Sequence, residues 1–203
     1  MRVLDLFCGA GGAATGLHRA WPDADIIGVD IKPQPRYPFT FVQADAMTYS
    51  LDGFDFIWAS PPCQRYSVMS REHNHPDLYA ETRCRLIATN TPYTIENVLG
   101  APAWHGTVLC GSMFGMAVRR HRNFETSWLI LNHLRCNHAK QGRPITITGN
   151  SGGTTEHSDK GVKAHWPQLM GMPWATPTEV TQAIPPAYAE FIAQQLLIER
   201  STP

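Results

Sequence analysis

Short apolar runs alternate along the chain with turn residues and with stretches of helical composition. The apolar runs predict strands over residues 2–7, 25–29, 40–43, 54–59 and 93–95, with two further candidates over 107–110 and 123–126. The helical stretches are residues 13–21, 77–90 and 186–199. Strands that alternate with helices are typical of an α/β fold, so we expect a mostly parallel sheet with helices on both faces.

The segment from Ser127 to His165 departs from this pattern. Its Gly- and Thr-rich piece at 146–155 shows no helical period. We therefore predict a small irregular or β-rich insert at 127–165. The insert follows a main domain at 1–126, which C-terminal helices at 166–203 complete.

Composition narrows the class of protein. A hydrophobic fraction of 43% and a charged fraction of 17% exclude a disordered chain. The chain has no apolar run of membrane-spanning length, and Asp5 interrupts any apolar leader, so we expect a cytoplasmic protein without a membrane span. The odd number of cysteines, 5, indicates free thiols. Because the formal net charge is zero, any role for nucleic acid must rest on local patches.

Four chemically active side chains lie at or just past the C-terminal ends of predicted strands. They are Asp30, Asp45, Cys63 and Glu96. In an open parallel sheet these strand ends line the ligand crevice. Four separate loops are therefore expected to deliver their side chains to one edge of the sheet.

The turn Gly9–Gly12 follows a strand and opens a helix. Glycines there let a ligand approach the backbone, and the helix N-terminus favours an anionic group. Asp30 follows about 20 residues later, where an acid can bind both ribose hydroxyls; this favours a nucleoside cofactor, either a dinucleotide or S-adenosylmethionine. Asp45 could accept a hydrogen bond from an adenine amino group. The alternatives are a plain tight connection for the turn and a capping role for Asp45.

The Pro-Pro-Cys segment is the most informative in the chain. Pro61 and Pro62 fix the backbone and present Cys63 on a rigid loop. A cysteine there is a candidate nucleophile, although most cysteines are buried apolar thiols. Glu96 ends the next strand; in a partly dry crevice its carboxyl would have a raised pKa and donate a hydrogen bond, whereas a solvated loop acid would not.

Four segments carry a family resemblance. They are Asp5–Gly12, Ser60–Gln64, Glu96–Val98 and Arg119–Glu125. In this order they resemble motifs I, IV, VI and VIII of the DNA cytosine-5 methyltransferases. Asp30 and Asp45 lie where the family has its motif II and III acids, and residues 182–188 are similar to its last motif. The resemblance covers residues 1–126 and 166–198, and it is strongest to the compact members carried by bacteriophages.

The resemblance implies a Rossmann-like, S-adenosylmethionine-dependent methyltransferase fold, with residues 1–126 as the catalytic, cofactor-binding domain and 127–165 as a target-recognition insert. It implies methyl transfer to C5 of cytosine in DNA, with the base flipped out and Cys63 bonded covalently to C6. Glu96 would contact the cytosine ring, and Arg120 and Arg122 would be active-site arginines. The residues expected to bind the cofactor are Phe7, Gly9, Gly11, Asp30, Ile31, Asp45, Ala46 and Pro62.

The sequence departs from the family pattern at three places. Val118 stands where many members carry Gln, and Gln182 stands where many carry Asn. The insert, residues 127–165, is far shorter than the usual target-recognition region. The expected readout of DNA sequence is therefore limited.

Local charge favours a nucleic-acid partner. The segment from residue 119 to residue 143 contains six basic residues and one acid, Glu125. These basic residues could contact phosphates; the alternative is that they form a solvated basic surface. The residues expected to contact DNA are Gln64, Ser67, Arg119, Arg135, Lys140 and Arg143. We expect no membrane association and no obligate protein partner, although a restriction endonuclease would fit as a partner. We expect the protein in the cytosol of a bacterium or of a phage-infected host.

The sequence also bears on a metal site and on other functions. His133, Cys136 and His138 fit no standard zinc spacing and have no evident fourth ligand, so no metal site is predicted. An RNA cytosine-5 methyltransferase on the same scaffold and a catalytically silent DNA-binding protein remain alternatives. A dinucleotide-dependent enzyme is disfavoured, because a Pro-Pro-Cys loop has no role in hydride transfer.

Overall fold

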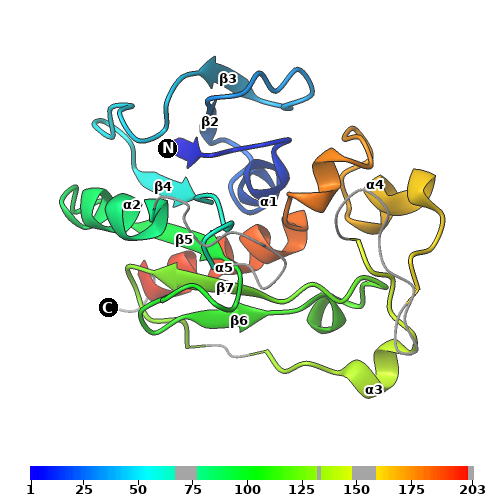
Figure 1. The fold of residues 1–203 in the computed structure, drawn as a ribbon. Coiled ribbons are helices and arrows are strands. Elements are labelled where there is room, and N and C mark those ends of the chain that lie inside the picture. Colours follow the sequence, from blue (N-terminus) through cyan, green and yellow to red (C-terminus); the bar gives the residue numbers. More distant parts are fainter. Residues whose placement is uncertain (67–76, 132–133, 148–158, 201–203) are drawn as a thin grey trace.

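The structure, a computed structural model, describes residues 1–66, 77–131, 134–147 and 159–200, with side chains described as far as residue 196 (Figure 1). Its strands are β1 (Arg2–Leu6), β2 (Asp25–Asp30), β3 (Thr40–Gln43), β4 (Phe56–Ala59), β5 (Tyr93–Asn97), β6 (Thr107–Leu109) and β7 (Arg122–Thr126). Its helices are α1 (Gly12–Ala20), α2 (Leu78–Ile87), α3 (His138–Gln141), α4 (Trp166–Leu169) and α5 (Pro186–Arg200), with short 3-10 turns η1 (Gly111–Phe114), η2 (Lys163–His165) and η3 (Glu179–Thr181).

The strands form one sheet in the order β3-β2-β1-β4-β5-β7-β6 (Figure 1). The first five are parallel, whereas β7 runs antiparallel to β5 and β6 antiparallel to β7. The expected mostly parallel sheet is therefore confirmed. The chain builds outward from β1 to β3 and then returns to add β4 on the other side of β1. This reversal of strand order lies between β1 and β4, where open α/β sheets bind their ligands.

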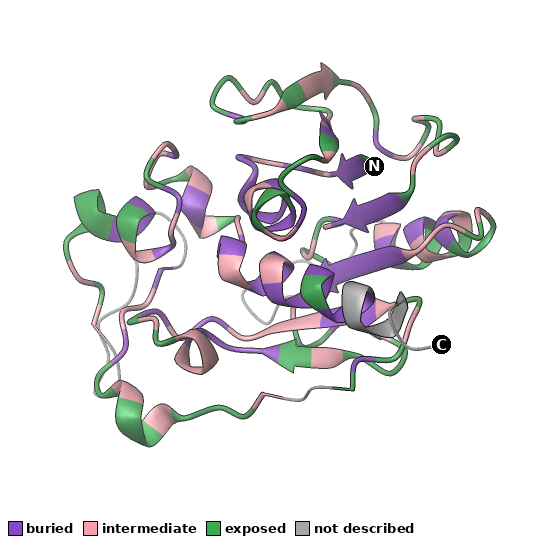
Figure 2. Cartoon of the chain, turned by 180° about the vertical axis from the view of Figure 1, so that it is seen from behind, coloured by how far each residue is buried: buried purple, intermediate pink, exposed green. Residues whose placement is uncertain are grey.

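Helices cover both faces of the sheet because successive strand residues point to opposite sides. On one face Val3 and Trp58 pack in a cluster with residues of α1 and α5 such as Leu17. On the other face Leu4 packs with residues of α2 such as Leu86. Figure 2 shows the central strands buried along their length, in contrast to the largely exposed α3, which has no buried residue.

Element boundaries differ from the predicted ones where tertiary pairing overrides local composition. β5 runs on to Asn97, past the apolar run that predicted its end at residue 95. The reason is its pairing with β7, in which Glu96 lies opposite Phe124. Glu96 is therefore held within the sheet, which fixes its direction more firmly than a loop would.

The predicted insert is irregular in its described part. It contains α3, η2 and two isolated bridges, Val118 with Ile145 and Ile145 with Asp159, but no strand among its described residues. Most of its Gly- and Thr-rich piece lies outside the described residues. Ile147 joins a cluster with Trp166 and Val180 from the C-terminal part. The proposed domain boundaries stay a prediction.

No helix in the described ranges combines the length and the apolar character that a bilayer span requires.

A buried acid in β1 makes the stability of the fold depend on pH. Asp5 is fully buried, and its Oδ2 accepts a hydrogen bond from the Tyr37 hydroxyl at 3.1 Å. Burial raises the pKa of Asp5 to about 7, above its unfolded value near 4. The folded state thus favours the protonated acid. The contribution of Asp5 to the free energy of unfolding is therefore fully present below pH 4 and is lost as the pH rises through 7.

We expect the melting temperature to fall between pH 5 and pH 8 and to fall less in Asp5→Asn, which cannot ionise. A shift of this size corresponds to at most about 4 kcal/mol of free energy of unfolding. Thermal unfolding of both proteins across this pH range checks the prediction. Parallel pH curves for the two proteins would contradict it.

Candidate active site

A cavity of about 340 Å³ opens at the point where the strand order reverses. Its lining combines the glycine turn after β1, the loop after β4 and the end of β5, and it includes Phe7, Gly9, Asp30, Cys63, Glu96 and Arg122. A larger depression of about 590 Å³, lined by residues such as Leu86 and Trp128, contains none of the predicted site residues. The chemistry therefore belongs to the smaller cavity, whose size suits a small organic ligand.

The glycine turn leaves its backbone open to the cavity. Gly9 has φ +48°, and a Cβ added there would meet nothing within 4 Å. Gly11 caps α1 at φ +82°, where a Cβ would lie 2.6 Å from Cδ of Pro38. Trp174 holds the turn from the other side by donating its Nε1 hydrogen to the Ala10 carbonyl at 2.9 Å. The turn thus requires glycine for its conformation and offers its backbone to a ligand.

Asp30 connects this turn to the end of β2. Its Oδ2 accepts from the Gly9 backbone N–H at 3.1 Å, and its Oδ1 accepts from that of Lys32 at 2.9 Å. Each carboxylate oxygen retains a lone pair for a further donor, such as a ribose hydroxyl. Because Asp30 lines the cavity beside the open glycine turn, the residues present fit the nucleoside part of the expected cofactor.

The other predicted cofactor residues divide into two groups. Ile31 and Pro62 line the cavity together with Phe7. Gly11, Asp45 and Ala46 are not in the lining formed by the described residues. Oδ1 of Asp45 accepts from the Met47 backbone N–H at 2.9 Å, which stabilises the turn and leaves Oδ2 for a further donor. A cofactor contact by these three residues stays a prediction.

The loop after β4 presents Cys63 half-buried in the cavity wall. Asn97 anchors the loop, since its Nδ2 donates to the Pro61 carbonyl at 2.9 Å. The Cys63 carbonyl accepts from the Tyr66 backbone N–H at 3.0 Å. The thiol is therefore accessible on a backbone that two prolines and one buried amide hold rigid.

Glu96 and Arg122 form an ion pair at the cavity wall. Nε of Arg122 lies 3.1 Å from Oε1 of Glu96, and both side chains are largely buried. Burial raises the pKa of Glu96, while the charges of Arg122 and Arg120 and a hydrogen bond with Ser60 lower it in part. The pKa of this carboxyl is thus closer to neutral pH than that of a solvated acid. The ion pair with Arg122 holds the carboxyl in one orientation.

Arg120 is buried, and it is not among the described residues that line the cavity. Its guanidinium donates to the carbonyls of Ile147 at 2.9 Å and of Thr181 at 2.6 Å. Burial and the neighbouring Arg122 lower the pKa of Arg120 to about 9, so it stays charged at neutral pH. Through these two bonds Arg120 links the insert to the C-terminal part, and its expected role as an active-site arginine stays a prediction.

The residues predicted to contact nucleic acid differ in their surroundings. Gln64 lines the cavity and is exposed, whereas Arg119 is half-buried and donates to Oε1 of Gln141 at 3.0 Å. Three more are exposed in or beside α3: Arg135, Lys140 and Arg143. Ser67 lies outside the described residues. Contact of these residues with nucleic acid stays a prediction.

Several cavity residues were not among the predicted site residues. They are Ser60, Lys32, Gln34, Glu179, Gln182, Ala183 and Ile184. Arg36 holds the cavity residue Glu179 through two hydrogen bonds that it donates to the carboxylate, at 3.0 and 2.8 Å. Residues 182–184 belong to the last motif, which was a usable signal. Glu179 lies far from Arg36 in sequence, and no local pattern pairs them.

The strand order, the glycine turn and the cavity at the strand-order reversal are those of a Rossmann-like fold, and the family match below makes it that of an S-adenosylmethionine-dependent methyltransferase. Residues 1–102 match the family model of the C-5 cytosine-specific DNA methylases. The chain belongs to this family. No curated protein matches it in sequence.

Solved structures resemble the chain despite low sequence identity. A triple-mutant DNMT2 from Spodoptera frugiperda is 12% identical and superposes with a TM-score of 0.69, over 97% of this chain and 99% of that one. The Entamoeba histolytica methyltransferase EhMeth is 17% identical, with a TM-score of 0.48 over 77% of this chain and 61% of that one. An RNA methyltransferase from Salinibacter ruber, in complex with S-adenosyl-L-homocysteine, is 14% identical, with a TM-score of 0.41 over 66% and 86%. The first of these supports the fold assignment.

Proposed function

We propose that the protein transfers a methyl group from S-adenosylmethionine to C5 of cytosine in DNA, with Cys63 as the nucleophile. The observation that carries the proposal is the shared cavity. An accessible thiol, a buried carboxyl paired with an arginine and an open glycine turn line the same space. The family supplies the expectation of DNA as the substrate.

The need for a nucleophile follows from the chemistry of the base. C5 of cytosine is a poor nucleophile in the aromatic ring. When the Cys63 thiolate adds to C6, the electron pair of the C5–C6 double bond moves toward C5 and into the ring. C5 then behaves as an enamine carbon. After transfer, loss of the C5 proton expels the thiolate and restores the ring, so Cys63 is regenerated.

Glu96 serves the same step from the other side of the ring. Burial raises the pKa of Glu96, which favours the protonated carboxyl that could donate a hydrogen bond at the ring nitrogen N3. A hydrogen bond there stabilises the electron density that enters the ring when the thiolate adds. Arg122 fixes the carboxyl in this direction through the ion pair at 3.1 Å.

The cofactor site follows from the glycine turn and Asp30. The Gly9 backbone is open to the cavity, and Asp30 is oriented to accept from ribose hydroxyls. When bound, S-adenosylmethionine supplies an electrophilic methyl group on a sulfonium centre. The chain's own contribution is to hold this centre and Cys63 at the same cavity, so that the target carbon meets both.

The substrate base has to leave the helix stack to reach this cavity. C6 is inaccessible inside a duplex, so the cytosine is flipped out or the substrate is single-stranded. The exposed cations in and beside α3 would contribute contacts to phosphates.

Transfer of a labelled methyl group tests the proposed function. The purified protein is incubated with methyl-labelled S-adenosylmethionine and either duplex DNA or tRNA, and the labelled nucleoside is identified. We expect label in 5-methylcytosine of DNA. Label confined to tRNA would assign the RNA activity instead, and salt-sensitive DNA binding without any label would assign a silent binding protein.

A further inference from the structure

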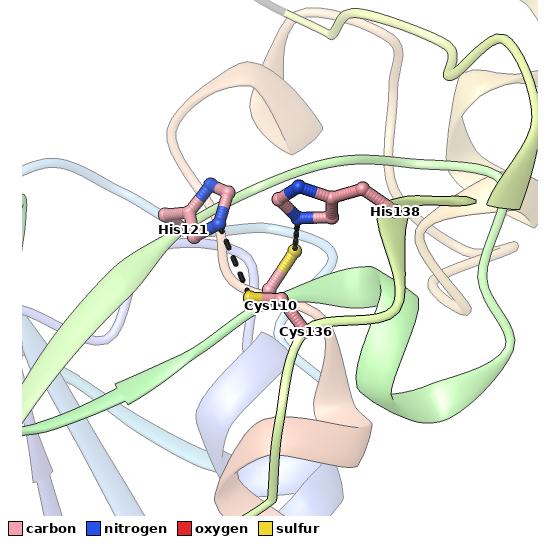
Figure 3. Close-up of side chains that lie close together, drawn as sticks. All are labelled: Cys110, His121, Cys136 and His138. Carbon is pink, nitrogen blue, oxygen red and sulfur yellow. Dashed lines mark hydrogen bonds between the residues drawn. The ribbon is translucent and has the colours of Figure 1, made fainter. Parts of the chain in front are cut away.

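Four metal-binding side chains converge beside the β6–β7 hairpin, outside the cavity of the active site. Cys110 follows β6, His121 precedes β7, and Cys136 and His138 lie at the start of α3 (Figure 3). The two sulfurs and one nitrogen from each ring all lie within 4.8 Å of one another. Figure 3 shows both rings turned toward the sulfurs, so the four side chains face a common point.

Two of the separations between these atoms match those of a tetrahedral metal site. Sγ of Cys110 lies 3.4 Å from Nε2 of His138, and Sγ of Cys136 lies 3.5 Å from Nε2 of His121. At the usual zinc bond lengths, a sulfur and a nitrogen ligand lie about 3.5 Å apart and two sulfurs about 3.8 Å apart. The remaining separations lie within 4.8 Å, so a bound ion would require the widest of them to shorten by about 1–1.5 Å.

We infer that Cys110, His121, Cys136 and His138 bind one zinc ion as a structural site. Two cysteines and two histidines form a standard zinc ligand set, and soft thiolates with imidazoles select zinc over calcium or magnesium. Four protein ligands leave no open position for a substrate, which is the pattern of a structural rather than a catalytic site.

Charge balance supports the same conclusion. Arg119, Arg120 and Arg122 flank His121 in sequence, so an uncompensated divalent cation there would meet strong repulsion. The two thiols lose their protons to solvent when they bind the ion, and two thiolates neutralise its charge. The cysteines are thus the ligands that make a cation acceptable at this position.

The surroundings of Cys110 also orient the site. The Ser112 hydroxyl donates to Sγ of Cys110 at 3.4 Å and accepts from the Asn137 backbone N–H at 3.1 Å. Ser112 thereby connects a ligand from the hairpin to the segment that carries the other two ligands. Such outer contacts fix the direction of metal ligands.

The site joins the insert to the catalytic sheet. Cys136 and His138 belong to the insert, whereas His121 is the residue directly before Arg122, which pairs with Glu96. Gln141 of α3 supports the junction by donating to the carbonyls of Met116 at 2.9 Å and Val118 at 3.2 Å. The zinc ion therefore holds the insert against the strand that positions the active-site arginine, and binding of the ion does not depend on the proposed function.

Metal content of the full-length protein tests this inference without any activity assay. The protein is produced with zinc in the medium, dialysed without chelator and analysed by elemental mass spectrometry. We expect one zinc per chain. In Cys136→Ser and His138→Asn the affinity should fall by more than about 10²-fold, since even outer-shell partners account for about 10–100-fold. The matched controls Cys84→Ser and His18→Asn change exposed residues elsewhere and should keep one zinc per chain.

Cobalt substitution keeps the test independent of the variants. The wild-type protein, stripped of metal and reloaded with Co²⁺, should show the intense visible bands of tetrahedral cobalt and a thiolate charge-transfer band. Wild-type protein that retains no zinc after dialysis and shows no such spectrum would overturn the inference. A disulfide between Cys110 and Cys136, or full zinc content in both ligand variants, would overturn it as well.

Discussion

Cys63→Ser should lower the rate of methyl transfer by at least about 10³-fold, because loss of a covalent nucleophile removes the whole addition step. A serine hydroxyl has nearly the same size as the thiol but is far less nucleophilic at neutral pH. The loop should keep its conformation, since Asn97 holds it through the Pro61 carbonyl and not through the thiol. Single-turnover transfer from labelled S-adenosylmethionine measures the effect.

The control for this variant is Cys84→Ser. Cys84 is an exposed free thiol on α2, outside the lining of the active-site cavity. Its replacement should leave transfer unchanged, which separates loss of the nucleophile from general sensitivity to cysteine loss. If Cys63→Ser transferred methyl groups within tenfold of wild type, nucleophilic catalysis at this residue would be ruled out.

Glu96→Gln should lower the turnover number by about 10²–10⁴-fold, the range for loss of a positioned acid. Glutamine keeps the volume and can still donate to N3, but it cannot share or release a proton as charge moves into the ring. The pH profile gives an independent check. Because the pKa of Glu96 is raised, the wild-type rate should fall on the alkaline side as the carboxyl loses its proton. That descending limb should be absent in the variant.

Folding has to be measured alongside, because Arg122 loses its ion-pair partner in Glu96→Gln. Breaking a buried pair costs about 3–5 kcal/mol, so the assay temperature should lie well below the melting temperature of the variant. Glu81→Gln, an exposed carboxyl on α2, is the matched control and should behave as wild type. An unchanged turnover number in folded Glu96→Gln would remove Glu96 from the mechanism.

Much of the site was predictable because parallel sheets obey a strong geometric rule. Asp30, Cys63 and Glu96 each follow or end an apolar strand, and the carboxyl ends of parallel strands meet at one edge. Once the strands were recognised, their convergence on one cavity required no knowledge of side-chain contacts. The same rule placed the glycine turn beside them.

Other features depend on contacts between distant parts of the chain, which local patterns do not encode. Asp45 satisfies the strand-end rule, but the hydrogen bond from the Met47 backbone N–H to its Oδ1 became visible only in the folded chain. Arg120 lies in a recognisable motif, yet its donors serve carbonyls of Ile147 and Thr181, and this became visible only in the folded chain.

The metal cluster is the clearest case of missing long-range information. The sequence analysis predicted no metal site because His133, Cys136 and His138 fit no standard zinc spacing and have no evident fourth ligand; of these, His133 lies outside the described residues. The fold brings in Cys110, just after β6, and His121, just before β7, so the ligand set spans 29 residues, from 110 to 138, without a standard spacing. A search for standard zinc spacings recognises only ligands that are close together in the sequence. The ligands of this site are not, because 14 residues separate His121 from Cys136.

The central claim is that Cys63 bonds to the target base, and trapping that bond tests it most directly. DNA that contains 5-fluorocytosine has no C5 proton to lose, so the thiolate cannot be expelled after methyl transfer. Incubation with this DNA and S-adenosylmethionine should give a stable complex of one protein and one DNA, and peptide mass spectrometry should place the bond at Cys63. Absence of a complex with wild-type protein, or attachment at another cysteine, would contradict the account.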